Sequence, residues 1–295
     1  MDEKVMASVT PRVAFYPGCS LEGSSGSFEA SVSEVFRVLG IERNTLKDWT
    51  CCGATSAHAV DRRLHLCLNL RNLAQAEAQG YEEVLAPCAA CYHRLAGANH
   101  ALQEDKALLA SLNSETGFDY KGGVKVRNVL DYLANVIGVE RITAKVTHPL
   151  SGLRTVCYYG CLNTRIPRMA SFDSVEYPMS MDRIVRGLGA ETLDWSYKTE
   201  CCGASLFLTA ESVSARLVAK ILKDAIAHGA ECIVVACPMC QNNLDTKQEV
   251  IREVFEIPRP IPVLFVTQLI GLALGLDAKA LKLSQSFVPF EKVLV

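Results

Sequence analysis

Short apolar runs and longer stretches with helical spacing follow one another along the chain. Arg12–Tyr16 is an apolar run that ends in Pro-Gly, which predicts a buried strand that enters a loop. Ser27–Leu39 has apolar residues at helical spacing and stops before Gly40, a residue that often ends a helix. Ala57–Ala78 continues this spacing over a longer stretch and predicts one long amphipathic helix.

The same plan continues to the end of the chain. Val84–Ala86 predicts a second strand that runs straight into Cys88, and Cys91–Leu102 predicts a helix. Later segments follow in the same order, and they are Met181–Leu188, Ala210–His228, Ile233–Ala236 and Cys240–Phe255. Alternating strands and helices are typical of an α/β fold with parallel strands.

The order of elements repeats because the sequence contains an internal duplication. The repeated segments are VAFYPGC and TVCYYGC, WTCCGA and ECCGAS, and YEEVLAPCAAC and AECIVVACPMC. A repeat of this length predicts two tandem α/β domains related by a pseudo-twofold axis, each with a CCG cysteine motif. We place the junction near Thr143–Arg154, which gives an N-terminal CCG domain over 1–148 and a C-terminal one over 149–295.

Composition narrows the possible partners. The 295 residues carry a formal net charge of −2, and no Lys/Arg run stands out, so nothing favours nucleic acid or an anionic membrane. The longest apolar stretch, Val263–Leu276, is too short to cross a bilayer and predicts a strand end followed by a buried helix. The polar N-terminus lacks the apolar centre of a secretory signal, so we expect no membrane span and a cytoplasmic location.

Thirteen cysteines in a reducing compartment favour metal ligation over disulfides. The count is odd, and Cys51–Cys52 and Cys201–Cys202 are adjacent in sequence, which ordinary disulfide geometry disfavours. Each half combines an early cysteine, a CCG and a CxxC. The candidate ligands are Cys19, Cys51, Cys52, Cys88 and Cys91 in the first half and Cys161, Cys201, Cys202, Cys237 and Cys240 in the second.

Zinc and iron–sulfur clusters are the competing interpretations. A structural zinc ion takes four ligands, and an adjacent cysteine pair would be crowded on one ion. A cluster of several irons can place neighbouring thiolates on different metals. Five thiols in each half therefore favour two iron–sulfur clusters, and the fifth thiol suggests that each departs from a simple cube.

Burying an anionic cluster requires compensation. Backbone N–H groups at the helix N-termini that follow the CCG and CxxC motifs can supply it. Gly53 and Gly203 are expected to let the backbone approach the sulfurs closely.

Several other reactive side chains are set aside. We interpret Cys67 and Cys232 as buried structural thiols and Cys157 as a packing residue, because each lies in a predicted helix or strand and none belongs to a CCG or CxxC motif. His58 and His93 follow the CCG and CxxC motifs of the first half closely and could donate a proton there. Neither is matched in the second half, so we interpret both as polar helix residues.

The doubled CCG signature resembles the cysteine-rich domain of the B subunit of heterodisulfide reductase, from Tyr16 to Val295. This resemblance implies two non-cubane [4Fe–4S] clusters, held by all ten motif cysteines, that reduce or form a thiol-coenzyme disulfide. It also implies a multi-subunit complex with a ferredoxin-like iron–sulfur subunit and an FAD-containing subunit as partners. No flavin fingerprint and no ferredoxin-type cysteine run occurs in the sequence, so these functions would come from the partners.

The family also implies an alternative function. Relatives with this signature include subunits of lactate and glycolate oxidases, quinone reductases, benzoyl-CoA reductases and sulfur-oxidising systems. In that case the chain would be an electron-transfer subunit without its own disulfide substrate.

Overall fold

The computed structural model describes residues 12–54, 56–165 and 172–290, so the polar N-terminal residues 1–11 lie outside the described residues. The described ranges form two four-stranded sheets, with strand orders β2-β1-β3-β4 and β6-β5-β7-β8, in which neighbouring strands run parallel. The strands are β1 (Arg12–Phe15), β2 (Glu42–Thr45), β3 (Glu83–Leu85), β4 (Lys125–Arg127), β5 (Arg154–Tyr158), β6 (Glu191–Thr192), β7 (Cys232–Val235) and β8 (Val263–Phe265). The same order in both sheets confirms the predicted α/β duplication.

Helices connect the strands throughout. Those of the first half are α1 (Gly18–Glu22), α2 (Gly26–Leu39), α3 (Ala57–Val60), α4 (Arg62–Ala78), α5 (Ala89–Glu104), α6 (Lys106–Thr116), α7 (Val129–Asp131), the π-helix η1 (Tyr132–Gly138) and α8 (Val139–Thr143). Those of the second half are α9 (Ser180–Gly187), the 3₁₀ turn η2 (Ala204–Leu206), α10 (Glu211–Ala227), α11 (Pro238–Thr246), α12 (Gln248–Arg252), α13 (Val266–Ala273) and the 3₁₀ turn η3 (Leu283–Gln285).

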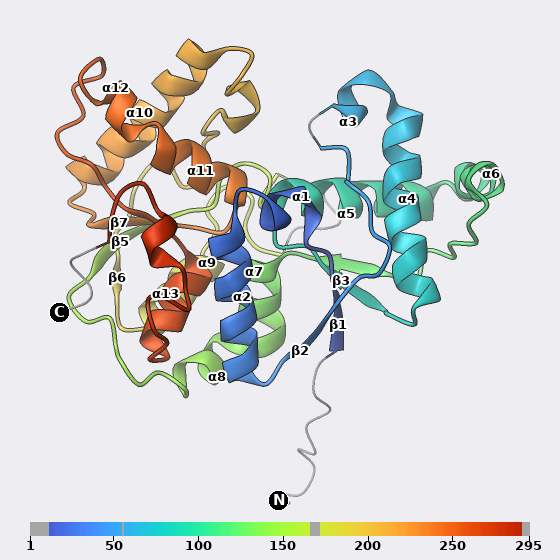
Figure 1. Cartoon of the computed structure of the whole chain (residues 1–295), viewed down its shortest axis with the longest axis horizontal. Helices are drawn as coiled ribbons and strands as arrows, with labels where there is room; N and C mark the ends of the chain where they lie inside the picture. The colour runs from blue at the N-terminus through green and yellow to red at the C-terminus, as the bar shows by residue number, and fades with distance from the viewer. Residues whose placement is uncertain (1–11, 55, 166–171, 291–295) are drawn as a thin grey trace, which may run out of the picture.

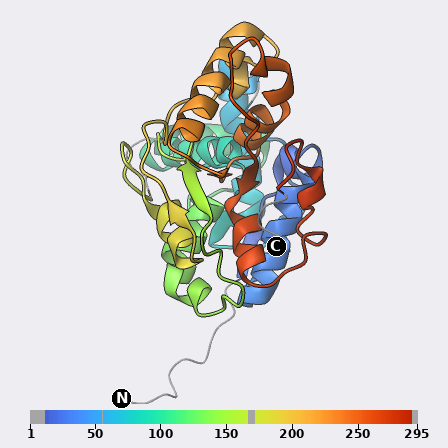
Figure 2. The same cartoon turned by 90° about the vertical axis from the view of Figure 1, so that its left-hand side faces the viewer.

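The two halves share a layer of helices that lies between their sheets (Figure 1). Helix α2 of the first half lies beside α13, the last α-helix of the second half, in both views (Figures 1 and 2). Phe28 stacks on Phe265 with ring centroids 4.1 Å apart, and the hydroxyls of Ser31 and Thr267 lie 2.7 Å apart. The reciprocal contact joins α9 to α8 and η1, so a helix that follows the first strand of each half packs on helices that follow the last strand of the other.

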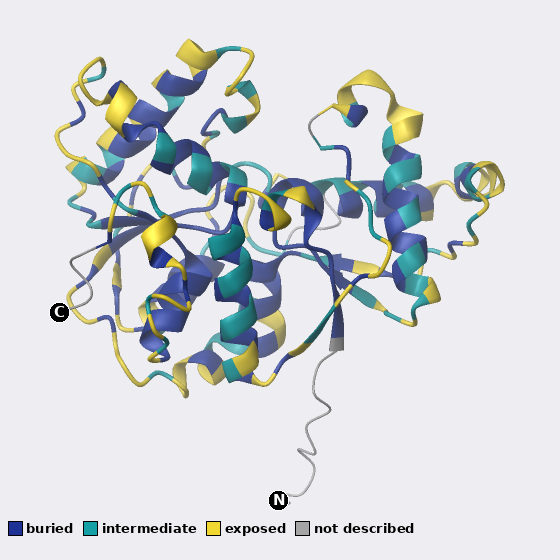
Figure 3. Ribbon diagram, viewed as in Figure 1, coloured by how far each residue is buried: buried dark blue, intermediate teal, exposed yellow. Residues whose placement is uncertain are grey.

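Burial follows this arrangement. The strands β7 and β8 and the helix α13 are buried at every position, whereas α2 buries one side (Figure 3). Strands buried on both faces are what a parallel sheet covered by helices on each side requires. The apolar Val263–Leu276 stretch forms β8 and α13, as the sequence predicted.

Two predicted helices are broken in the structure. Ala57–Ala78 divides at Asp61, whose carboxylate accepts hydrogen bonds from the backbone N–H groups of Arg63 and Leu64 and so starts α4 as its N-cap. Cys240–Phe255 divides at Lys247 into α11 and α12.

Some elements were missed by the sequence pattern. The strand β2 has the sequence ERNT, and its residues are exposed or half-buried, so it carries no apolar signal. The strand β6 spans only Glu191–Thr192. Both lie at a sheet edge, where pairing with β1 or β5 decides their conformation.

Spanning a bilayer takes about 20 consecutive, mostly apolar helical residues. Among the helices of the described ranges, none is long and apolar enough to cross a membrane.

Candidate metal centres

Three loops of each half bring the motif cysteines to one edge of a sheet. In the first half, Cys19 follows β1, the CCG follows β2, and Cys88 follows β3. These strands are neighbours in the order β2-β1-β3, so their carboxyl ends meet. Because the connections diverge between β1 and β3, this edge is also where open α/β sheets bind ligands.

The second half repeats this arrangement. Cys161 follows β5, the second CCG follows β6, and Cys237 follows β7, in the order β6-β5-β7. The second thiol of each CxxC lies in the first turn of a helix, Cys91 in α5 and Cys240 in α11. The predicted use of helix N-termini at the CxxC motifs therefore matches the fold.

Matched thiol contacts occur in the two groups. The sulfurs of Cys52 and Cys91 lie 3.5 Å apart, and those of Cys202 and Cys240 lie 3.7 Å apart. The backbone N–H of Gly53 donates to the Cys51 sulfur over 3.4 Å. In the second half, the N–H of Gly203 donates to the Cys201 sulfur over 3.3 Å, so the donor set is duplicated with the motif.

Electrostatic coupling links all five thiols of the first half. The pKa of the Cys19 thiol is raised. Burial is the largest cause, and the charges of Cys51, Cys52 and Cys88 add to it. Hydrogen bonds to Cys52 and Cys88 raise the pKa of Cys91 well above its ordinary value. The five sulfurs thus form one group.

The second half is coupled in the same way. The pKa of Cys161 is raised. A hydrogen bond to Cys201 is the largest cause, burial is the next, and the charges of Cys201, Cys202 and Cys237 follow. Hydrogen bonds to Cys202 and Cys237 raise the pKa of Cys240.

Each group also contains a thiol that ionises easily. The hydrogen bond from Cys91 lowers the pKa of Cys88 to about 7, and the hydrogen bond from Cys161 lowers the pKa of Cys201 to about 6. Metal ligands must be thiolates, so both groups hold a thiol that is ready to bind near neutral pH.

Buried polar side chains fix the cysteine loops. The hydroxyl of Tyr16 donates to the carbonyl of Thr50, and that of Tyr158 donates to the carbonyl of Glu200, each over 2.6 Å. Each bond ties the loop of the first cysteine to the residue just before the CCG. The repeated tyrosine in VAFYPGC and TVCYYGC was the signal for these residues, which the cysteine motifs alone did not reveal.

The amides of Asn69 and Asn243 hold the second CCG cysteine. Asn69 donates to the carbonyl of Cys52 over 3.1 Å, and Asn243 donates to that of Cys202 over 2.8 Å. They come from different helices, α4 and α11, so no sequence repeat could have paired them.

Glycines approach the sulfurs, but they are not the ones expected. A Cβ at Gly18 would lie 2.8 Å from the Cys91 sulfur, and one at Gly160 would lie 3.0 Å from the Cys240 sulfur. The side-chain positions of Gly53 and Gly203 instead face the helices that follow, so these glycines contribute their N–H groups only. The prediction of close approach at the CCG glycines was therefore right for the backbone N–H and wrong for the missing side chain.

Gly18→Ala is expected to damage the N-terminal thiol group. Gly18 has φ +64°, and the added methyl group would overlap the Cys91 sulfur. We expect about half of the iron to be lost on anaerobic purification, measured as iron per chain. Gly40→Ala is the matched control, because Gly40 has φ +69° with nothing within 4 Å. It should show only the backbone strain of about 1–2 kcal/mol and keep its iron. Equal iron in both variants would contradict this role for Gly18.

The donor set fits a soft metal centre. No three His, Cys, Asp or Glu side chains of the described ranges lie in an arrangement ready to hold a single metal ion. The residues gathered here are five thiols per half, which select zinc or iron–sulfur clusters among biological metals. The thiolates, the backbone N–H donors and the small-residue gaps beside Cys91 and Cys240 all suit an anionic cluster of several irons.

The three cysteines outside the motifs lie away from these groups. Cys157 and Cys232 are fully buried in β5 and β7 and pack in the core. Cys67 is half-buried on α4, so its interpretation as a buried thiol was wrong. Helix α4 turns only one side to the core, which the leucines around Cys67 did not reveal.

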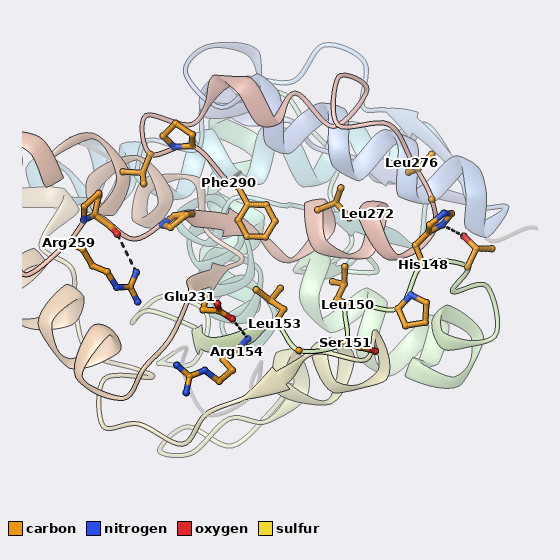
Figure 4. A pocket seen from close by; sticks show the side chains of 18 residues that line it. His148, Leu150, Ser151, Leu153, Arg154, Glu231, Arg259, Leu272, Leu276 and Phe290 are labelled. Atoms are coloured by element: carbon orange, nitrogen blue, oxygen red, sulfur yellow. Dashed lines mark hydrogen bonds between the residues drawn. The ribbon is translucent and has the colours of Figure 1, made fainter. Parts of the chain in front are cut away.

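A large open groove differs in character from the thiol groups. It has a volume of roughly 1250 Å³, and Figure 4 shows it lined by residues such as Leu150, Leu153, Leu272 and Phe290. None of its lining residues is a cysteine. The carboxylate of Glu231 at its edge accepts a hydrogen bond from the backbone N–H of Arg154 over 3.0 Å.

Comparison with known proteins agrees with this geometry. The sequence model of the cysteine-rich domain named CCG matches the chain twice, over residues 13–96 and 155–245. The chain belongs to the cysteine-rich CCG domain family. The two matches span every motif cysteine and confirm the resemblance found in the sequence.

Two CCG relatives match over nearly their whole length. The 8-methylmenaquinol:fumarate reductase membrane anchor subunit of Wolinella succinogenes is 34% identical over 281 residues, covering 95% of this chain and 98% of the relative. The B subunit of the ferredoxin/F420H2-dependent CoB–CoM heterodisulfide reductase of Methanosarcina acetivorans is 30% identical over 285 residues, covering 94% of each. The CCG protein is therefore similar to subunits of multi-subunit reductases.

A solved structure shares the fold of the CCG protein. A hypothetical protein from Helicobacter pylori superposes with a TM-score of 0.76 at 13% identity, over 94% of this chain. The match spans about half, 52%, of that longer chain.

Proposed function

We propose that the chain is the B-type subunit of a redox complex and that it reduces or forms a thiol-coenzyme disulfide. In this proposal Cys19, Cys51, Cys52, Cys88 and Cys91 hold one non-cubane [4Fe–4S] cluster, and Cys161, Cys201, Cys202, Cys237 and Cys240 hold the second. The family resemblance and the five coupled thiols in each half support it.

The observation that carries the proposal is that both thiol groups border the interface between the halves. Helix α1, which contains Cys19, contacts α11, which contains Cys240. On the other side, Asn128 of the first half donates to the side-chain carbonyl of Asn163 over 2.8 Å, two residues after Cys161. The two centres would thus face a shared region.

A shared region suits disulfide chemistry. Splitting a disulfide takes two electrons, and an iron–sulfur cluster normally passes one, so two centres would supply both. Cys19 and Cys51 are exposed and Cys161 and Cys201 are half-buried, while the other motif thiols are buried. The outer thiols mark the side from which a substrate would approach, and the buried ones anchor the clusters.

Partners complete the proposed complex. A ferredoxin-like iron–sulfur subunit and an FAD-containing subunit would deliver electrons to this chain. Subunits of heterodisulfide reductases among the relatives support this assignment.

A second candidate is an electron-transfer subunit without a disulfide substrate. The relative named as a subunit of an 8-methylmenaquinol:fumarate reductase favours it, because its identity is higher than that of the heterodisulfide reductase relative. In this role the two centres would pass electrons between partner subunits.

Anaerobic purification followed by EPR spectroscopy tests the proposal. We expect about eight irons per chain, from two four-iron clusters, with matching acid-labile sulfide. Adding the CoB–CoM heterodisulfide or another organic disulfide should produce a new paramagnetic signal. Clusters that stay silent toward every thiol and disulfide would favour the electron-transfer role, whereas zinc without sulfide would contradict both.

A further inference from the structure

The two thiol groups are matched, but the charges around them are not. In the first half the half-buried Arg94 lies three residues after Cys91 on α5, so the two side chains share one face of that helix, and the Cys91 sulfur lies 3.5 Å from that of Cys52. Three histidines gather beside Arg94. The rings of His58 and His65 lie 6.3 Å apart, and His93 is the residue before Arg94 on α5.

Arg94 and two of these histidines have buried side-chain nitrogens without a hydrogen-bond partner among the described residues. The Nδ1 atoms of His58 and His93 and the Nε atom of Arg94 are buried and have no hydrogen-bond partner among the described residues. Buried donors without partners are costly, and an anionic group beside them would stabilise them.

The second half has neutral side chains at the corresponding positions. Counting from Cys91 and Cys240, Asn242 replaces His93 and Asn243 replaces Arg94. Asp61 and Ala210 are the N-caps of α4 and α10, and counting from them Ser214 replaces His65 and Phe207 replaces His58. The guanidinium and imidazole groups of the first half therefore have no counterparts at these four positions, although the ammonium of Lys247 lies 4.3 Å from the centre of the Phe207 ring.

Hydrogen bonds to the sulfurs do not offset this difference. Each CCG receives the same glycine N–H bond, at 3.4 and 3.3 Å. Each half also has one polar side chain bonded to a motif sulfur. The hydroxyl of Ser20 bonds Cys88, and the amide of Asn243 bonds Cys202, and each bond lowers the pKa of its thiol as a smaller contribution.

Two cations of the second half, Lys247 and Arg165, have to be weighed against Arg94. Lys247 follows Cys240 by seven residues, whereas Arg94 follows Cys91 by only three, so Arg94 lies closer to the CxxC along its helix. The charge of Arg165 favours the Cys201 thiolate, but Glu200 acts in the opposite direction on the same thiol. Arg165 is exposed and Arg94 is half-buried, so solvent screens the charge of Arg165 more strongly.

Solvent exposure also favours added negative charge at the first group over the second. The outer thiols of the first group, Cys19 and Cys51, are exposed, whereas Cys161 and Cys201 are half-buried. Water stabilises added negative charge, and solvent exposure and net charge are two of the factors that set cluster potentials.

We propose that the N-terminal centre has the higher reduction potential of the two and is reduced first. This inference rests on the proposed pair of clusters. One electron from a one-electron donor adds one negative charge to the centre and leaves the donor oxidised by one electron. No bond forms or breaks, and no proton transfer is required. Arg94, the N–H groups of the histidines and water stabilise the added charge more than the exposed Arg165 and the more distant Lys247 do at the second centre.

Potentiometric titration with dithionite, followed by EPR on the anaerobic full-length protein, tests the order of reduction. Two one-electron waves are expected, and Cys52→Ala should remove the upper one while Cys202→Ala removes the lower one. Arg94→Gln should make reduction of the upper centre about tenfold less favourable, a fall of about 59 mV, and leave the lower wave in place. Arg94→Lys keeps the charge and should retain most of the potential.

Arg216→Gln is the matched control, because it removes an exposed positive charge from α10, the counterpart of α4. It should move neither wave. The proposal is overturned if the upper wave disappears with Cys202→Ala, or if Arg94→Gln and Arg216→Gln behave alike. If Arg94→Gln loses iron, its potentials cannot be compared. The cysteine variants then decide the test, because they show which centre gives the upper wave. Absence of two four-iron clusters in the unaltered protein would refute the proposed function itself, before any potential is measured.

Discussion

Cys202→Ala is expected to halve the iron content and to leave the N-terminal centre intact. The Cys202 sulfur lies 3.7 Å from that of Cys240, and it is buried within its group, so water cannot replace it easily as a ligand. Cys52→Ala should have the mirror effect, because Cys52 makes the equivalent contact with Cys91. Iron and sulfide analysis together with EPR of each variant provides the measurement, with one spectral component missing in each.

One cysteine in each half that does not belong to a CCG or CxxC motif provides the control for that half. Cys232→Ala removes a fully buried thiol from the second half, and Cys67→Ala removes a half-buried one from the first. Both should keep two centres, at a cost in stability of about 1 kcal/mol for the lost packing. If Cys52→Ala and Cys202→Ala kept both spectra unchanged, the five-ligand assignment would be wrong.

Lys198→Met is expected to cost about 3–5 kcal/mol of unfolding free energy. The ammonium of Lys198 lies 2.9 Å from the carboxylate of Asp182, and their side chains are only 4% and 1% exposed. Removing the lysine leaves Asp182 buried without its cation, although the hydroxyl of Tyr159 still donates to it over 2.7 Å. Urea unfolding followed by circular dichroism measures the loss.

The same substitution should weaken the C-terminal centre. The backbone carbonyl of Lys198 accepts hydrogen bonds from the N–H groups of Tyr159 and Gly160, so it joins the loop that ends in Cys161 to the loop that ends in Cys201. We expect iron to be lost from this half first.

A double variant separates the buried charge from simple packing. Adding Asp182→Asn to Lys198→Met removes the uncompensated carboxylate, and at least part of the lost stability should return. The exposed Lys220→Met is a control that should change stability by about 0.5 kcal/mol or less. A Lys198→Met variant as stable as Lys220→Met would contradict the role of the buried pair.

Much of the fold could be predicted from local patterns. The helices α2, α5, α9 and α10 and the strands β1, β3 and β7 lie within a few residues of their predicted ranges. The break at Asp61 was missed although an aspartate before Arg-Arg-Leu is a strong N-cap signal, because the apolar spacing continues across it. The break at Lys247 had no such signal. Gln248 there exchanges two hydrogen bonds with the backbone of Ile261, a contact that only the folded chain creates.

The histidines show the limit of interpreting a site from one half at a time. His58 and His93 were interpreted as polar helix residues because the second half does not match them. The structure brings them together with His65 and Arg94 beside Cys52. Their lack of a counterpart, which argued against a role in the sequence, became the basis for the proposed difference between the centres.

The sequence by itself determined the duplication, the α/β class and the grouping of five cysteines in each half, because these follow from short-range spacing and from the rule that parallel strands end at one edge. The packing of α2 on α13 and the approach of Gly18 and Gly160 to the CxxC sulfurs were decided by the tertiary structure alone. These contacts join residues far apart in the chain. The helix contact forms only when both halves have folded, and each glycine contact forms only when distant loops of the same half meet, so no local pattern encodes them.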